Sequence, residues 1–238
     1  LTDVMIKARE AGIKTVSYDR LIQNAGCDLY ISFDNTEVGR LMARSLLENI
    51  PDGGDIFLIQ GPLTDHNVTL VREGIDETLA GSSLSVVYES NCAGWVAENA
   101  YTYTKEGLKQ DRYVKGIICG NDDLASQAFR ALSEERLAGK VYVTGQDGDL
   151  AACQRIVEGT QEMTAFKSVE QEASMAAKCA VLLGLGEEIE EARSTAYDGT
   201  YQVPYLELQP IAVTGENMDE VIIKGGFHAK EDVYLNVN

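Results

Sequence analysis

The stretch Val141-Tyr142-Val143-Thr144-Gly145-Gln146-Asp147 decides the fold, because an apolar, β-branched run stops abruptly at polar side chains. Runs of this composition are typical of buried strands. Four more segments share the pattern: Thr15-Val16-Ser17-Tyr18-Asp19-Arg20, Ile56-Phe57-Leu58-Ile59-Gln60-Gly61, Ile117-Ile118-Cys119-Gly120-Asn121-Asp122 and Met163-Thr164-Ala165-Phe166-Lys167. Each segment therefore predicts a strand that ends at side chains able to bond a polyol.

Helical patterns separate these runs, so the strands are predicted to be parallel and the fold class to be α/β. Helices are expected at 2–12, 37–49, 67–80, 96–109, 123–137, 149–158 and 169–184, and strands at 14–18, 29–33, 55–60, 84–89, 115–119, 140–145 and 162–166. Residues 195–213 are predicted to be extended, and 221–226 to form a short strand and turn. In such sheets ligands bind outside the carboxyl ends of the strands, so the polar endings predict one shared site.

The composition excludes several classes of partner. The 238 residues are 45% hydrophobic and carry a net charge of -18, which argues against a nucleic acid and against an anionic membrane surface. No apolar run approaches the length of a membrane helix, so direct membrane insertion is not expected. The length suits one large domain or two small ones.

Cofactors, metals and catalytic residues are not predicted. Phosphate-binding glycine loops and a nucleophile elbow are missing, and the chain has only two histidines and no CxxC pair. The odd number and wide spacing of the cysteines argue against a disulfide framework. These cysteines are Cys27, Cys92, Cys119, Cys153 and Cys179; Cys119 and Cys179 are expected to be buried in a strand and a helix.

Seven side chains at or after the strand ends are candidates to bind a sugar. Carboxylates accept from hydroxyl groups, Arg, Asn and Lys donate to them, and an aromatic ring covers the C–H face of the sugar. The candidates are Asp19, Arg20, Asn67, Trp95, Asn121, Asp147 and Lys167, with Asp122 beside them.

Simpler readings exist for six of the seven candidates. Asp19 and Arg20 could be a surface ion pair, and 121–123 could only cap the next helix. Likewise, 147–149 could be a turn and a cap, Lys167 a solvated lysine, and Trp95 a core residue. The expected meeting of these residues at one edge of the sheet favours the binding interpretation.

The order and spacing of several motifs resemble the type I periplasmic sugar-binding proteins of bacterial ABC importers. The resemblance covers essentially the whole chain. The matching motifs are Ala11-Gly12-Ile13-Lys14, Tyr18-Asp19-Arg20, Tyr30-Ile31-Ser32-Phe33-Asp34-Asn35, Gly94-Trp95 with Glu98-Asn99-Ala100, Asn121-Asp122, Gly145-Gln146-Asp147 with Asp149-Leu150, Gly159-Thr160-Gln161 with Met163-Thr164 and Lys167, and Gly225-Gly226-Phe227-His228.

The resemblance implies two doubly wound lobes that close on a sugar by a hinge. Three crossings are expected near 33–35, 167–169 and 199–203. A partial N-terminal lobe would then comprise 1–33 and 168–202, and a C-terminal lobe 34–167 and 203–238. Members of this family begin with two further βα units, so the first lobe is expected to be incomplete.

The resemblance also implies residue roles. Asp19 and Arg20 would reach the sugar from the first lobe, and Asn121 and Asp147 from the second. Trp95 would stack on the sugar and Lys167 would sit at the hinge. Asn67 matches an asparagine of the family, whereas its neighbour His66 replaces another one.

The expected function is the binding of a pentose, D-xylose first, for ABC-type uptake, with no enzymatic step. The partner would be a membrane permease or a sensor kinase. A periplasmic or extracellular location is implied, with a lipid anchor of the Gram-positive type upstream of Leu1. Alternatives are a xylose-sensing domain partnered with a histidine kinase, a repressor core, which would need a basic DNA-binding head, and a sugar-processing enzyme.

Overall fold

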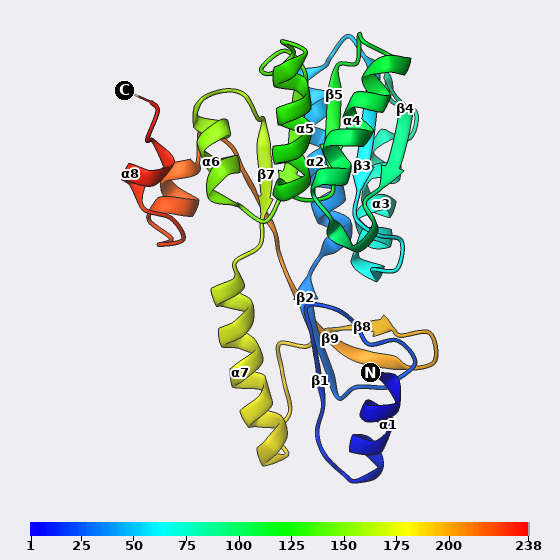
Figure 1. The fold of residues 1–238 in the computed structure, drawn as a ribbon. Helices are drawn as coiled ribbons and strands as arrows, with labels where there is room; N and C mark the ends of the chain where they lie inside the picture. Colours follow the sequence, from blue (N-terminus) through cyan, green and yellow to red (C-terminus); the bar gives the residue numbers. More distant parts are fainter. Residues whose placement is uncertain (238) are drawn as a thin grey trace. The chain divides into compact units, whose positions relative to one another are not determined.

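The computed structural model describes residues 1–237, and these fold into two compact units (Figure 1). Unit 1 consists of Leu1–Asp34 and Ser168–Pro210. Unit 2 consists of Asn35–Lys167 and the chain from Ile211 onward. The chain therefore passes from one unit to the other three times.

Unit 2 is built on a six-stranded sheet with the order β10-β7-β6-β5-β3-β4. Every pair of neighbours is parallel except β10 and β7, so the predicted parallel strands are confirmed. The strands are β3 (Gly54–Gln60), β4 (Leu84–Asn91), β5 (Gly116–Cys119), β6 (Tyr142–Gln146), β7 (Met163–Phe166) and β10 (Ile211–Val213).

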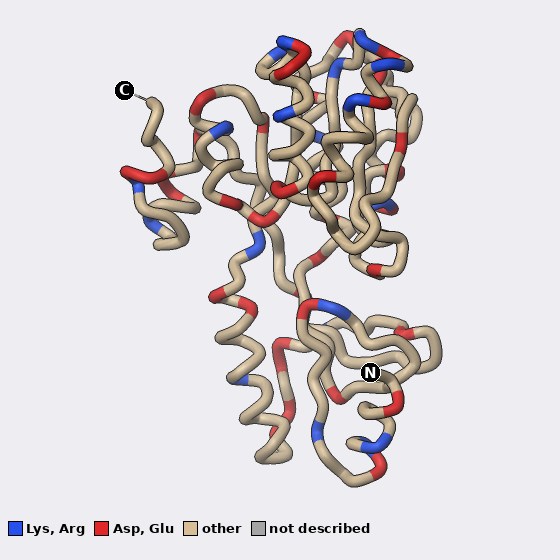
Figure 2. The backbone as a smooth tube through the Cα atoms, in the orientation of Figure 1, with Lys and Arg blue, Asp and Glu red and all other residues tan. Residues whose placement is uncertain are grey.

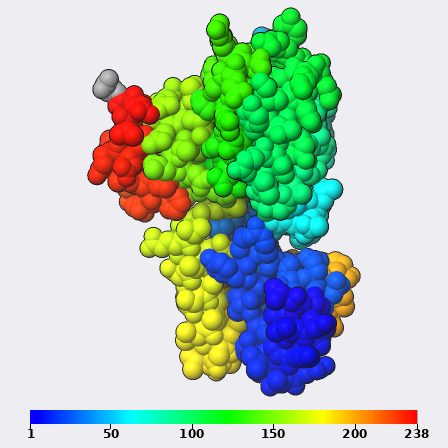
Figure 3. All heavy atoms as spheres, in the orientation of Figure 1, coloured from blue at the N-terminus to red at the C-terminus, as the bar shows by residue number. Residues whose placement is uncertain are grey.

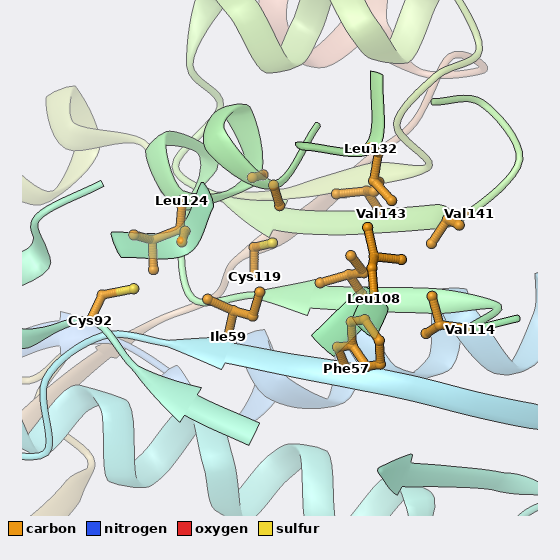
Figure 4. Packing of buried hydrophobic residues seen from close by; sticks show 14 residues of the cluster. Phe57, Ile59, Cys92, Leu108, Val114, Cys119, Leu124, Leu132, Val141 and Val143 are labelled. Carbon is orange, nitrogen blue, oxygen red and sulfur yellow. The ribbon is translucent and has the colours of Figure 1, made fainter. Parts of the chain in front are cut away.

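Helices cover both faces of this sheet, because alternate strand residues point to opposite sides. Ile56 and Leu58 of β3 pack in one hydrophobic cluster with α2, α3 and their neighbours, while Phe57 and Ile59 pack in another with α4 and α5 (Figure 4). The helices of unit 2 are α2 (Asn35–Asn49), α3 (His66–Leu79), α4 (Glu98–Gln110), α5 (Asp122–Glu134), α6 (Leu150–Val157) and the short α8 (Lys230–Val233).

Unit 1 contains a four-stranded sheet with the order β1-β2-β9-β8. All five residues of β2 are buried. One face packs on α7 (Val169–Leu185) through Leu29, Ile31 and Phe33, and the other face meets Met5 of α1 (Thr2–Glu10). The strands are β1 (Val16–Tyr18), β2 (Leu29–Phe33), β8 (Ser194–Tyr197) and β9 (Gln202–Leu208).

The third crossing lies further along the chain than the sequence indicated. The prediction put it at 199–203, but β9 continues to Leu208 and pairs with β2 in parallel and with β8 in antiparallel fashion. Residues 203–208 therefore belong to unit 1. The expectation that residues 195–213 are extended is confirmed by β8, β9 and β10, and within β9 Pro204 is exposed while Val203, Leu206 and Leu208 are buried.

The prediction of a short strand and turn at 221–226 is wrong for the strand, whereas residues 224–226 do form a turn. Residues Asp219–Ile223 form a π-helical turn, η2, which packs beside Phe166 and α6. A short apolar run such as Val221-Ile222-Ile223 does not distinguish a strand from a helical segment by its periodicity. The C-terminal segment that contains this turn packs against α6 (Figure 3). In this contact Gln154 Nε2 of α6 donates a hydrogen bond to Asp232 O at 2.8 Å.

Asp and Glu residues are distributed over helices and loops of both units, in keeping with the net charge (Figure 2). All five cysteines are buried, which confirms the expectation for Cys119 and Cys179. Within residues 1–237, no helix combines the length and the apolar character needed to cross a membrane.

A buried carboxylate ties the two chain segments of unit 1 together. Asp198 Oδ2 accepts from the backbone N–H groups of Ala25 and Gly26 at 3.0 and 2.7 Å, and Oδ1 accepts from those of Thr200 and Tyr201 at 2.9 and 2.7 Å. Burial alone raises the pKa of Asp198, but these backbone donors outweigh it and the net pKa is lowered.

Asp198→Asn is expected to lower the free energy of unfolding by at least about 2 kcal/mol, because an amide replaces one acceptor oxygen with a donor. Since the folded-state pKa is lowered, the stability that Asp198 contributes is present above its unfolded pKa of about 3.9 and is lost as pH falls through the folded value. The test is urea unfolding at several pH values, with hydrogen exchange at the four bonded amides.

Glu10 is exposed in unit 1, so Glu10→Gln is the matched control. It should change neither the free energy of unfolding nor the hydrogen exchange of the four amides. Slow exchange at these amides in Asp198→Asn, with unchanged stability, would contradict the assigned role.

Candidate functional site

Five candidate side chains lie at the carboxyl ends of five neighbouring parallel strands in unit 2. Across the sheet from β7 to β4, the strands are followed by Lys167, Asp147, Asn121, Asn67 and Trp95. The helices that follow β3 and β5 pack on opposite faces of the sheet. Ligands of open α/β sheets bind at the point where the connections of two neighbouring strands run to opposite faces of the sheet. Here this point lies between β3 and β5, the strands that precede Asn67 and Asn121. The structure thus brings these five candidates to one edge, as the sequence predicted.

Asp147 and Lys167 form an ion pair at this edge. Lys167 Nζ lies 3.1 Å from Asp147 Oδ1, and the two side chains are 17% and 38% exposed, respectively. Lys167 is therefore not the freely solvated lysine of the simpler reading. The pair sets a hydrogen-bond acceptor beside a donor, which suits two adjacent hydroxyl groups of a polyol.

Asn121 is both a helix cap and a candidate ligand. Its Oδ1 accepts from the backbone N–H of Leu124 at 2.9 Å at the start of α5. The simpler reading of this residue as a cap is therefore correct. The cap uses the side-chain oxygen, so the amide nitrogen can still donate to a ligand.

Asp122 is not a cap but a fully buried acceptor under the Asp147 loop. Its Oδ2 accepts from Thr164 Oγ1 at 2.7 Å and from the backbone N–H groups of Gly148 and Asp149 at 3.0 and 3.1 Å. Burial raises the pKa of Asp122 to about 7, although the hydrogen bond from Thr164 opposes the rise; the charge of Asp147 adds to it. This carboxylate joins β7 and the loop after β6 to the start of α5.

Trp95 is half-buried, with its indole positioned by two neighbours. It is the last residue of the short 3-10 turn η1 (Ala93–Trp95) and lies shortly before α4, the helix that was predicted to begin at residue 96. Trp95 Nε1 donates to Asp65 Oδ2 at 3.1 Å. The ring also lies so close to Gly61 that a Cβ at position 61 would stand 2.3 Å from two ring carbons. The ring also packs against the hydrophobic core on the α4 side of the sheet.

Asp65 connects Trp95 to Asn67. It is the N-cap of α3, and its Oδ1 accepts from the backbone N–H of Asn67 at 3.1 Å. His66 begins α3 and is exposed, whereas Asp65 and Asn67 are buried. Sequence reasoning missed Asp65 as a positioning group; an acidic residue directly before an apolar helical pattern is the signal that could have found it.

Asp19 and Arg20 are the candidates of unit 1. They follow β1 and form an ion pair with each other, as the simpler reading proposed. The backbone of Asp19 is held by a bond from its N–H to Ile31 O at 2.9 Å, and its carbonyl accepts from Tyr30 Oη at 3.3 Å. The pair is therefore presented from the end of a strand, like the candidates of unit 2.

Backbone strain marks three of the candidates. Asp19, Trp95 and Asp147 have φ angles of 59°, 59° and 101°, in the region that favours glycine. Such residues cost about 1–3 kcal/mol each and persist only where their surroundings fix them, and they cluster at binding sites. The strain supports a functional interpretation of all three positions.

Gly61→Ala is expected to displace the indole of Trp95, because the added Cβ would overlap the ring. Trp95 is the single tryptophan, so its fluorescence emission maximum reports the change directly. We expect a shifted emission maximum and weaker sugar binding. Gly184→Ala is the control, since a Cβ there meets no atom within 4 Å. Emission and affinity equal to those of the unchanged protein would refute the role of Gly61.

Asn121→Ser and Asn121→Ala separate capping from ligand binding. Serine keeps an oxygen that can cap α5, whereas alanine loses the cap and about 1 kcal/mol of stability. If the amide nitrogen binds the sugar, both variants should lose affinity, but only the alanine variant should unfold at a lower temperature. Calorimetric titration and thermal unfolding provide the two readouts. Full affinity in the serine variant would reduce Asn121 to a cap.

Comparison with known proteins agrees with this arrangement. Residues 1–188 match the family model described as a periplasmic binding protein domain. The D-xylose-binding periplasmic protein of Haemophilus influenzae is 41% identical over 239 residues, covering 98% of this chain and 71% of that protein. The protein of the same description from Escherichia coli is 38% identical over 238 residues, covering 98% and 72%.

A solved structure shows the same architecture. An ABC transporter solute binding protein from Clostridium phytofermentans, with bound β-D-glucose, superimposes with a TM-score of 0.88 at 25% identity, covering 98% of this chain and 78% of that one. The resemblance noted in the sequence is confirmed. The chain belongs to the periplasmic binding protein family and has the two-lobed α/β fold of its type I sugar-binding members.

Proposed function

We propose that the chain binds a pentose, D-xylose first, as the solute-binding component of an ABC-type sugar importer. The observation that carries the proposal is the Asp147–Lys167 ion pair at the strand ends, in line with Asn121, Asn67 and Trp95. Two relatives named for D-xylose binding, at 41% and 38% identity, support the choice of sugar.

The proposed contacts follow from the chemistry of each group. Asp147 accepts hydrogen bonds from hydroxyl groups, and Lys167 and Asn121 donate to hydroxyl oxygens. Trp95 covers an apolar face of the ring. A site of this kind rejects an analogue that lacks a hydroxyl group, since a half-buried polar group would then lose its partner. Asn67 completes the set in unit 2.

Unit 1 carries two further side chains that could bind a sugar. Asp19 and Arg20 offer an acceptor and five donors at the end of β1. Calorimetry of Arg20→Ala tests this role: weaker sugar binding is expected, and an unchanged affinity would contradict it.

The family suggests a cellular location and a partner for the chain. Its members are periplasmic binding proteins, so an extracytoplasmic location is supported. We propose a membrane permease as the partner of the sugar-bound protein. We also propose a lipid anchor, which radioactive palmitate labelling of cells would reveal. We further propose that no chemical step follows binding; recovery of unchanged D-xylose after long incubation tests that point.

Calorimetric titration against a panel of pentoses and hexoses should give the tightest binding with D-xylose. A sugar at one hundred times its Kd should stabilise the fold by about 2.7 kcal/mol, because it binds only the folded state. Asp147→Ala and Lys167→Ala should each weaken binding by about ten- to hundredfold, as expected for a hydrogen bond to a charged group.

Asp52→Ala and Lys140→Ala are matched controls. Both side chains are exposed. Asp52 precedes β3 and Lys140 precedes β6, so both lie at the amino ends of the strands, away from the candidate site. Both variants should bind like the unchanged protein. Failure of every pentose to bind, or undiminished binding by Asp147→Ala, would overturn the proposal.

A further inference from the structure

The loop that carries Asp147 adopts a backbone that its surroundings must hold in place. Two successive residues have positive φ angles, 101° at Asp147 and 76° at Gly148. Asp147 is not a glycine, so its conformation is strained and would relax in a free loop. Whatever fixes 147–149 also decides where the Asp147 carboxylate stands.

Two side chains that lie below this loop fix it. Gly148 N–H is shared between Asp122 Oδ2 at 3.0 Å and Thr164 Oγ1 at 3.1 Å. The next amide, Asp149 N–H, donates to Asp122 Oδ2 at 3.1 Å, and Thr164 Oγ1 donates to the same oxygen at 2.7 Å. Asp122 and Thr164 are both fully buried, so no water competes with these bonds.

The position of the Asp122 carboxylate is itself set by its neighbours. A Cβ at Gly145 would lie 2.3 Å from Asp122 Oδ1, so only glycine leaves room there. Gln161 Nε2 donates to the same oxygen at 3.1 Å, and Gln161 Oε1 accepts from Arg155 Nε at 2.9 Å. The buried carboxylate and the buried guanidinium are thus linked through one amide side chain. This link offsets part of the cost of burying two charges.

A third contact restrains the loop from the C-terminal segment. His228 Nε2 lies 2.8 Å from Gly148 O, to which it donates. Phe227 packs on Phe166 at a ring-centroid distance of 4.8 Å, and a Cβ at Gly148 would meet Phe166 at 2.7 Å. The peptide of Gly148 is therefore held at its nitrogen by Asp122 and Thr164, and at its oxygen by His228.

We propose that Asp122 and Thr164 are positioning residues for ligand binding, which hold the strained 147–149 loop so that the Asp147 carboxylate stays beside Lys167. This inference rests on the proposed sugar site: Asp147 touches the ligand, and Asp122 and Thr164 act through it. A group held in its binding position before the ligand arrives loses less conformational freedom on binding, which raises affinity.

The first test compares Thr164→Val with Thr164→Ser. Valine keeps the size of the side chain and removes the hydroxyl that links Asp122 to Gly148, whereas serine keeps that hydroxyl. We expect Thr164→Val to weaken D-xylose binding about tenfold and Thr164→Ser to restore most of it. Thr104→Val is the matched control. Its hydroxyl is also buried but bonds only the backbone of its own helix, at Ala100 O, so affinity should be unchanged.

A double-mutant cycle separates positioning from general loss of stability. If Thr164 acts through Asp147, Thr164→Val should have little further effect once Asp147→Asn has removed the charge. In an Asn121→Ser background, by contrast, Thr164→Val should keep its full tenfold effect. Equal effects of Thr164→Val in the Asp147→Asn protein and in the unchanged protein would overturn the inference. An unchanged affinity for Asp147→Asn would overturn the sugar site itself, and this inference with it.

Hydrogen exchange supplies a readout that needs no ligand. In Thr164→Val and Asp122→Asn, the amide protons of Gly148 and Asp149 should exchange at least about tenfold faster, while those of β3 and β5 stay protected. Protection at Gly148 and Asp149 equal to that of the unchanged protein would show that the loop holds itself and would overturn the proposal. Uniformly faster exchange in all strands would likewise overturn it, as a sign of global destabilisation.

Discussion

A carboxylate can remain inside a protein only where hydrogen-bond donors surround it, and both units depend on this constraint. Asp122 gathers donors from the loop after β6, from Gln161 and from β7. Asp198 gathers backbone donors from its own loop and from Ala25, which is 173 residues away in the sequence. In each unit, one buried aspartate therefore fixes loops that no regular ladder of hydrogen bonds would hold. Removing either side chain leaves several amides without a partner.

Structural and binding roles coincide at the same residues. Asn121 caps α5 with its oxygen while its nitrogen remains available, and Trp95 contributes to the core while part of its ring stays exposed. The simpler readings of these residues were therefore not alternatives to binding. A side chain that also caps a helix or fills a core is already ordered, so less conformational entropy is lost when it meets a ligand.

The sequence predicted the alternation of strands and helices and the shared edge of the sheet, because buried parallel strands read as short apolar runs. It placed the third crossing too early, because no local pattern showed that Val203, Leu206 and Leu208 are buried in unit 1. It also missed the roles of Asp122 and Asp65. Those roles depend on contacts between residues 26–42 positions apart, such as Gly148, Asp149 and Thr164 with Asp122, or 30 apart, as for Asp65 and Trp95. Local patterns carry no information about such pairs.

The three crossings have a consequence for how the protein is made. Tyr205 Oη donates to Phe33 O at 3.0 Å, and these residues are 172 positions apart, because β9 pairs with β2 only after the main segment of unit 2 has intervened. At a synthesis rate of about 5–20 residues per second, β2 waits roughly ten to thirty seconds on the ribosome for its partner. The five buried residues of β2 stay uncovered by β9 throughout this interval. Translation speed and holding chaperones therefore bear on unit 1 more than on unit 2.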